Sequence, residues 1–379
     1  MTRNFKNIKR IVVKVGSSSL TNKNCEVDED KIRSLVSQIM ELKKRGFKVV
    51  LVSSGAVACG VGKLKPKKAV YTIPEKQAMA AVGQGILIHK YERVFAEYGL
   101  TIAQVLLTRG DFSSRQRFLY ARNAVECLLN MDVIPIINEN DTVSVDELKL
   151  GDNDRLSALV AVLIDADMLM MLTDIDGLYD RNPNDSNAKL IFDVYSITED
   201  ISFAAGNSSS SVGTGGMITK LQAAKIAGDS GIIMGIMKAY SPNILIRFIS
   251  GEKIGTVFWP KSDSLKRKKR WIAFASDIRG KLIIDDGAKK ALIFKGKSLL
   301  PSGIVEVCGR FDIGNTVSIS GIDGEEVAKG IVNFSSEEIE KIKGNKTSEI
   351  EKILDYKYCD EVIHRNNMVV TKDLMNNKA

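Results

Sequence analysis

The densest group of side chains that could carry chemistry lies between Ile136 and Arg155. Asn138-Glu139-Asn140-Asp141 follows an apolar run at 133–137, and Gly151-Asp152-Asn153-Asp154 opens a helical pattern at 156–164. In open α/β sheets, ligands bind beyond the ends of the strands. Carboxylates and carboxamides at this density can hold a small polar ligand that carries an ammonium group. A turn and a helix cap are the alternative interpretation, because Asp and Asn are favoured at both.

Three glycine-containing turns and two lysines indicate a site for an anion. Lys14-Val15-Gly16-Ser17 and Ser53-Ser54-Gly55-Ala56 each end a strand pattern, and Gly213-Thr214-Gly215-Gly216-Met217 opens a helix that carries Lys220. Glycine lets the backbone approach a phosphate, and a helix start offers N–H donors. A lysine inside a buried strand is costly unless its ammonium meets an anion, although it can instead reach the sheet edge. Together these residues predict phosphoryl transfer, which works by positioning and charge neutralisation.

Alternating strand and helix patterns must position these residues. Short apolar runs predict strands at 11–15, 48–52, 102–107, 133–137, 168–172 and 232–236. Apolar residues at helical spacing predict helices at 28–46, 75–98, 115–130, 154–165 and 216–227. This alternation predicts an α/β fold with a mostly parallel sheet between layers of helices.

The sequence pattern changes after a basic segment at 261–270. Glycines then separate short strands expected at 282–284, 291–294, 304–307, 316–320 and 327–332, and a helix is expected at 335–343. Such spacing predicts a small, mostly antiparallel β barrel or sandwich. The expected organisation is therefore a first domain at 1–260, a basic linker at 261–275 and a β domain at 276–379.

Composition restricts the function classes. Hydrophobic residues make up 44% and charged residues 26%, as in ordinary soluble proteins, and no apolar run approaches the roughly 20 residues of a membrane helix. The five cysteines are scattered and no signal-peptide pattern is seen, so a cytoplasmic location is expected. The two histidines argue against a histidine-based zinc site or a Ser-His-Asp triad, and His89 is expected to pack among apolar neighbours.

Read in order, the motifs resemble those of the amino acid kinase family, followed by a PUA domain. The kinase resemblance covers nearly all of residues 8–260, and its combination of motifs is specific although each motif alone is not. The segments that carry it are Val12-Val13-Lys14-Val15-Gly16-Ser17, Val52-Ser53-Ser54-Gly55-Ala56-Val57, Ala80-Ala81-Val82-Gly83-Gln84, Leu107-Thr108-Arg109, Asn138-Glu139-Asn140-Asp141, Gly151-Asp152-Asn153-Asp154, Leu172-Thr173-Asp174 and Gly213-Thr214-Gly215-Gly216-Met217. Ser298-Leu299-Leu300-Pro301 resembles the PUA part.

Within that family the resemblance implies ATP-dependent phosphorylation of the γ-carboxylate of L-glutamate, the first step of proline biosynthesis. It implies that Lys14 and Lys220 neutralise the transferring phosphoryl group, and that Asp154 holds both lysines. Mg²⁺ is expected to arrive on ATP, with no protein ligand assigned to it. The implied glutamate-binding residues are Ser54, Asn138, Asp141, Asp152 and Asn153. The implied nucleotide-binding residues are Lys14, Thr173, Asp174, Thr214, Gly215, Gly216, Met217, Ile218, Thr219 and Lys220.

The resemblance also implies feedback inhibition by proline and a homo-oligomer, either a dimer or a tetramer.

Another amino acid kinase, acting on N-acetylglutamate, aspartate or a nucleoside monophosphate, is the nearest alternative function. An RNA-binding protein is the alternative from another class, because PUA domains often contact RNA. Of the net charge of +8, the six basic residues and one acidic residue at 261–270 supply +5. The residues after 270 carry −1, which counts against nucleic acid as a partner. The segment 234–252 receives no role.

Overall fold

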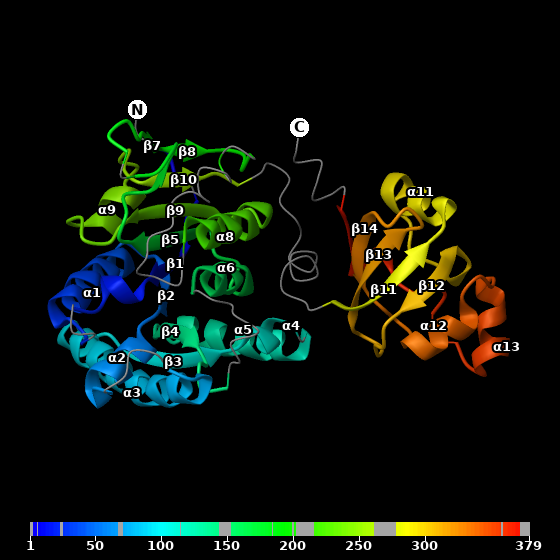
Figure 1. The fold of residues 1–379 in the computed structure, drawn as a ribbon, viewed down its shortest axis with the longest axis horizontal. Coiled ribbons are helices and arrows are strands. Elements are labelled where there is room, and N and C mark those ends of the chain that lie inside the picture. The colour runs from blue at the N-terminus through cyan, green and yellow to red at the C-terminus, as the bar shows by residue number, and fades with distance from the viewer. Residues whose placement is uncertain are drawn as a thin grey trace. The chain divides into compact units, whose positions relative to one another are not determined.

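The computed structural model describes residues 3–5, 7–22, 26–66, 71–113, 115–143, 153–183, 185–198, 201, 216–260, 278–357 and 359–371. The chain divides into two compact units, Met1–Ser264 and Leu265–Ala379 (Figure 1), and each unit has its own hydrophobic core. The predicted basic linker lies outside the described residues, so the domain bounds expected from the sequence stay a prediction. Within the described part of the chain, every helix is too short or too polar to span a bilayer.

The first unit is built on an eight-stranded sheet with the order β3-β4-β2-β1-β5-β9-β10-β8. The six strands from β3 to β9 run parallel, β10 is antiparallel to β9, and β8 pairs parallel to β10. The mostly parallel sheet expected from the sequence is confirmed. The strands are β1 (Arg10–Val15), β2 (Lys48–Ser53), β3 (Ile102–Leu107), β4 (Ile134–Glu139), β5 (Met168–Thr173), β8 (Asp193–Val194), β9 (Ile233–Lys238) and β10 (Thr256–Phe258). A separate ribbon joins β6 (Leu178–Tyr179) to β7 (Leu190–Ile191).

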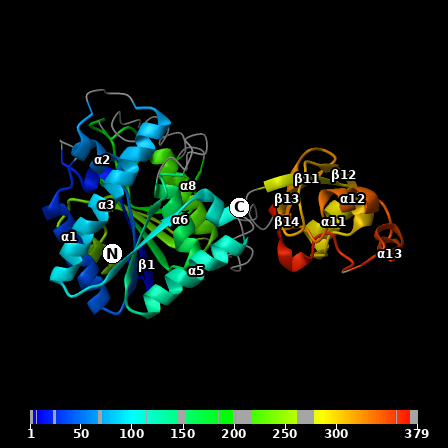
Figure 2. The same ribbon diagram turned by 90° about the horizontal axis from the view of Figure 1, so that it is seen from below.

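Helices cover both faces of this sheet (Figure 2). One face packs on α1 (Glu29–Lys44), α3 (Ile73–Glu97) and α9 (Ile244–Ile249), through alternate strand residues such as Ile11, Val13 and Val15. The other face packs on α5 (Arg115–Asn130), α6 (Asn153–Leu163) and α8 (Met217–Asp229). The remaining elements are η1 (Ser17–Ser19), α2 (Ala56–Leu64) and α4 (Arg109–Ser113).

Local signals explain where the helices begin. Asp28 caps α1 by accepting hydrogen bonds from the backbone N–H groups of Asp30 and Lys31. Thr72 and Glu75 form a capping box at the start of α3.

The prediction for His89 was wrong, because this α3 residue points to solvent with 71% of its side chain exposed.

Helices α2 and α3 approach each other so closely that their backbones touch. A Cβ atom added at Gly60 would lie 1.9 Å from the carbonyl oxygen of Met79. A Cβ added at Gly83 would lie 1.8 Å from the carbonyl oxygen of Ala56. Only glycine fits at such contacts, so these two positions set the spacing of the helix pair.

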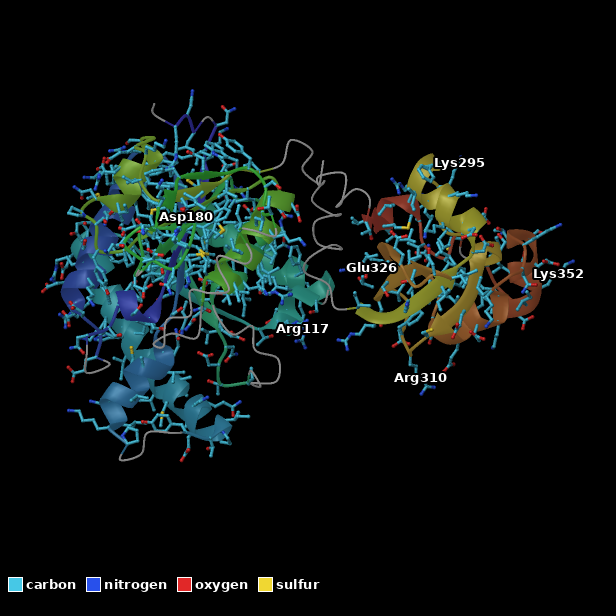
Figure 3. The ribbon with its side chains drawn as sticks, turned by 45° about the horizontal axis from the view of Figure 1, so that its top comes forward. Arg117, Asp180, Lys295, Arg310, Glu326 and Lys352 are labelled. Atoms are coloured by element: carbon cyan, nitrogen blue, oxygen red, sulfur yellow. The ribbon has the colours of Figure 1, made fainter. Side chains whose placement is uncertain are left out.

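The second unit has one five-stranded, mostly antiparallel sheet with the order β12-β11-β13-β14-β15. Its strands are β11 (Ile278–Ile284), β12 (Ile304–Cys308), β13 (Thr316–Gly321), β14 (Glu326–Ile331) and β15 (Met368–Val370). Its helices are α11 (Asp286–Lys295), α12 (Ser336–Ile342) and α13 (Ile350–Leu354), with short turns at η4 (Pro301–Gly303), η5 (Thr347–Glu349) and η6 (Arg365–Asn367). Charged side chains such as Arg310 and Lys352 lie at the outside of this unit (Figure 3).

The strand predicted at 291–294 was wrong, because these residues belong to α11. Asp285 caps this helix by accepting a hydrogen bond from the backbone N–H of Ala288, and Gly296 ends it in the left-handed conformation with φ +60°. The two caps define a helix of 10 residues around the short apolar run. The helix expected at 335–343 is confirmed as α12, with Ser335 at its N-cap.

Candidate active site

Strand β1 places a buried lysine near its carboxyl end, on the side of the sheet where the parallel strands end. Side chains alternate between the two faces of a strand, so Lys14 shares with Val12 the face that packs on α6. Only 4% of Lys14 is exposed, and its Nζ atom lies 2.5 Å from Oδ1 of Asp154. The lysine therefore does not reach out to solvent, and its charge is met by a buried carboxylate.

Asp154 brings a second lysine to the same place. It lies in the first turn of α6 and is fully buried, and its Oδ2 atom is 3.1 Å from Nζ of Lys220. Lys220 lies in the first turn of α8 and is 6% exposed. Thr219 donates a hydrogen bond of 2.9 Å to the same Oδ2 atom. One carboxylate thus orients two ammonium groups from β1 and α8, and the three charged side chains sum to +1.

A chain of carboxamides lies at the ends of the neighbouring strands β2 and β4. Nδ2 of Asn153 is 2.8 Å from the backbone carbonyl of Ser53, 2.7 Å from Oγ of Ser54 and 2.9 Å from Oδ1 of Asn138. Nδ2 of Asn138 donates in turn to Oε1 of Gln84 on α3, at 2.8 Å. We call Asn153, Asn138 and Gln84 the amide relay. Because Asn153 and Asp154 are adjacent in α6, the relay and the lysine pair are joined at one helix start.

The structure brings three of the five residues predicted to bind glutamate into contact with one another. Ser54, Asn138 and Asn153 are in direct contact. Asp141 lies half-buried in a turn just after β4, three residues beyond Asn138. Asp152 lies outside the described residues, so its predicted role stays untested.

Apart from Lys14 on β1, the described residues predicted to bind the nucleotide lie at the carboxyl end of β5 and at the start of α8. Thr173 is the last residue of β5, and its hydroxyl donates to Oδ1 of the exposed Asp174 at 2.9 Å. Gly216 is the N-cap of α8, Met217 is buried beneath it, and Ile218 is 53% exposed. Strand β5 lies between β1 and β9, so Thr173 borders the strand that carries Lys14. Thr214 and Gly215 lie outside the described residues.

Sequence reasoning missed two residues that support this site. Gln84 forms one end of the amide relay, and the hydroxyl of the fully buried Tyr91 lies 3.0 Å from Oγ of Ser53. Burial raises the pKa of Tyr91 above its usual value, so this hydroxyl stays protonated. Gln84 and Tyr91 are seven residues apart, which places them on one face of α3. Gln84 stands in the family motif Ala80–Gln84 without an assigned role, and its spacing to Tyr91 does not reveal which strands this face of α3 meets.

The side chains present suit an anion better than a protein-bound metal. Each carboxylate oxygen of Asp154 is already bonded to an ammonium group. Among the described residues, no three His, Cys, Asp or Glu side chains are grouped as metal ligands. Mg²⁺ that enters on a nucleotide fits this arrangement, because it keeps phosphate oxygens and water as ligands.

Comparison with known proteins agrees with this geometry. The amino acid kinase family matches residues 9–237, and the PUA domain matches residues 280–354. A glutamate 5-kinase of Thermoanaerobacter sp. (strain X514) is 52% identical over 362 residues, covering 95% of this chain and 97% of the relative. A glutamate 5-kinase of Geobacter sp. (strain M21) is 50% identical over 367 residues, covering 97% of this chain and 98% of the relative.

A solved structure shares the fold of the first unit. Carbamate kinase from Giardia lamblia, bound to AMP-PNP, superimposes over 68% of this chain and 100% of its own length with a TM-score of 0.50, at 16% sequence identity. The residues that match the family model include Lys14, Asp154 and Lys220. The chain belongs to the amino acid kinase family, with a PUA domain after its kinase unit.

Proposed function

We propose that this chain transfers the γ-phosphoryl group of ATP to the γ-carboxylate of L-glutamate, forming ADP and L-glutamyl 5-phosphate. This is the first step of proline biosynthesis, catalysed by a phosphotransferase with a carboxyl group as acceptor. The two relatives that are 52% and 50% identical to this chain over nearly their whole length are glutamate 5-kinases. The observation that carries the proposal is the buried Asp154 held between Lys14 and Lys220, directly beside the amide relay.

The chemistry needs little more than positioning. A glutamate side chain has a pKa near 4.3, so its γ-carboxylate is already ionised at neutral pH and no general base is required. One carboxylate oxygen attacks the γ-phosphorus, and the bond to the β,γ-bridging oxygen breaks as ADP leaves. The ammonium groups of Lys14 and Lys220 neutralise the charge on the phosphoryl oxygens, and Asp154 keeps both lysines in place.

The polar groups beside the lysines serve the acceptor. Ser54, Asn138, Asp141, Asp152 and Asn153 bind L-glutamate in this proposal. Carboxylate and amide oxygens take up its ammonium group, and hydroxyl groups and the remaining N–H groups take up its carboxylates. The support is the contact of Ser54, Asn138 and Asn153 at the strand ends next to the lysines.

The nucleotide lies on the other side of the lysine pair. In the proposal, Thr173 and Asp174 hold it at the end of β5, and the segment 214–220 holds its phosphates at the start of α8. A helix N-terminus of this length favours anions through its N–H groups and its dipole. Mg²⁺ bound to the nucleotide would supply further positive charge to the phosphates, and no residue of this chain is assigned as its ligand.

Regulation and assembly are also proposed from the family. Proline is the expected feedback inhibitor, and the enzyme is expected to act in the cytoplasm as a homo-dimer or homo-tetramer. The PUA domain is given no nucleic-acid partner, because the residues after 270 carry a net charge of −1.

An assay of ADP release tests the proposed reaction. We expect turnover that requires L-glutamate and Mg²⁺, with rates on L-aspartate and N-acetylglutamate lower by about 100-fold, the scale of a misplacement of about 1 Å in the reacting atom. A glutamate-free reaction serves as the blank for ATP hydrolysis. Equal rates on aspartate or N-acetylglutamate would assign the chain to another branch of the family.

A further inference from the structure

The direction of every hydrogen bond in the amide relay is fixed by one backbone atom. The carbonyl oxygen of Ser53 can only accept a hydrogen bond, so the atom of Asn153 that lies 2.8 Å from it must be the amide nitrogen. Because that nitrogen is a donor, the atom of Asn138 at 2.9 Å must be its oxygen. The nitrogen of Asn138 then faces Gln84, so Oε1 of Gln84 must accept this hydrogen bond, at 2.8 Å.

The fixed orientation of these amides determines which atom of Asn153 can meet a ligand. Nδ2 of Asn153 has two hydrogens and three acceptors around it, so it is fully used within the protein. Its Oδ1 atom has no hydrogen-bond partner among the described residues. That oxygen can only accept, so the group that it suits is a donor such as a primary ammonium.

Helix α3 is anchored to hold Gln84 at the end of the relay. Gly83 lets α3 touch the backbone of α2, and Tyr91 bonds to Ser53 two turns farther along. The face of α3 is therefore fixed to the end of β2 through Tyr91 and to the end of β4 through Gln84. Asn138 is only 3% exposed, so water is a poor substitute for the oxygen of Gln84.

We propose that Gln84 is a positioning residue of the glutamate site. It holds the amide of Asn138 in one orientation and, through Asn138, directs Oδ1 of Asn153 towards the ammonium group of the acceptor. This inference rests on the proposed function. It adds a residue of α3 that acts on substrate binding through Asn138.

Loss of the Gln84 oxygen leaves the buried N–H group of Asn138 without its acceptor. The amide of Asn138 can then turn over and present its nitrogen to the nitrogen of Asn153, which breaks the relay. We expect Gln84→Met to raise KM for L-glutamate by about 10-fold, which corresponds to about 1.4 kcal/mol. The KM for ATP should change by less than about 2-fold, because the relay lies on the acceptor side.

A double-mutant cycle separates positioning from direct binding. KM for L-glutamate and for ATP is measured for the wild type, Gln84→Met, Asn138→Ala and the double variant, in the full chain with Mg²⁺-ATP. If Gln84 acts through Asn138, Gln84→Met has almost no further effect once Asn138 is alanine. His89→Met is the matched control, since it places methionine on the exposed side of the same helix and should leave both KM values unchanged.

Two results would overturn the inference: a wild-type KM for glutamate in Gln84→Met, or additive effects in the double variant. If Gln84→Met does not fold by circular dichroism, Gln84→Asn takes its place in the cycle, since it keeps an amide that is one methylene too short to reach Asn138. A wild-type chain without glutamate-dependent ADP release would instead refute the proposed function, so the two failures are distinguishable.

Discussion

Asp154 divides its two carboxylate oxygens between two lysines that are far apart in the sequence. A carboxylate that is shared in this way leaves each ammonium group only partly neutralised, and both remain available to a phosphoryl group. The arrangement explains why the lysine inside β1 is tolerated, because its charge is paired within the protein. The same arrangement explains why a site for phosphoryl transfer needs no histidine here.

Replacing either lysine tests this assignment. We expect Lys14→Ala and Lys220→Ala to lower kcat by at least about 100-fold, the scale for losing one preorganised group that stabilises the transition state. The KM for glutamate should change less, since the lysines act on the phosphoryl group. Steady-state kinetics check this, with Lys225→Ala on the exposed side of α8 as control. Near-normal turnover in Lys14→Ala would make Lys14 a structural residue.

Individual residues were predictable where the sequence itself constrains them. The polar break in the apolar run of β1 singled out Lys14, and the family motifs led to Asp154 and Lys220. Gln84 and Tyr91 could not be assigned, because their roles depend on which strand ends the α3 face meets. That information comes from tertiary packing and is absent from local pattern.

At the scale of elements, the close pair α2 and α3 determines where the relay ends. Both glycine contacts involve backbone atoms, which cannot move aside as a flexible side chain can. Helix α2 begins at Ala56, two residues after Ser54, and α3 carries Gln84 next to Gly83. The spacing of the helix pair therefore sets the reach of Gln84 to Asn138.

Two glycines of α3 make a matched test of that spacing. Gly83→Ala should lower the free energy of unfolding by roughly 1–3 kcal/mol, because its Cβ would collide with the carbonyl of Ala56. Gly85→Ala should raise it by roughly 0.5–1 kcal/mol, since a Cβ there meets no atom within 4 Å and alanine favours helix. Urea unfolding of both variants measures the difference. Equal shifts in the two variants would contradict the backbone contact.

Elements differ in how well the sequence predicts them. The strands of the first unit were predictable because each is a short apolar run in a regular alternation. The run at 291–294 was misassigned because four apolar residues fit a strand as well as a helix. The distinguishing signals were Asp285 and Gly296, which cap the helix at either side of the run.

At the scale of the whole molecule, the two hydrophobic cores have no residue in common. One contains residues from 11 to 257, and the other contains residues from 282 to 370. Every residue proposed to touch a substrate precedes Lys225 and belongs to the first unit. The first unit is long enough to bury a complete core of its own.

A chain that ends at Ser264 should therefore fold and phosphorylate glutamate. We expect kcat and both KM values within about 3-fold of the full chain, with changes confined to proline inhibition or oligomeric state. Circular dichroism, gel filtration and the ADP assay check these expectations. A soluble, folded but inactive product would show that the PUA domain completes the active site, and an insoluble product would show that it covers apolar surface.

The fixed direction of the amide relay has a consequence for how this site can evolve. Each amide has one permitted orientation, set at Ser53, so the effect of changing one member depends on the identity of the next. An aspartate at position 138, for example, would need a donor rather than an oxygen from position 84. Substitutions along the relay should therefore be epistatic. A lineage that shifts towards a different acceptor would be expected to change positions 84, 138 and 153 together, and members of the family should carry these three residues as a correlated set.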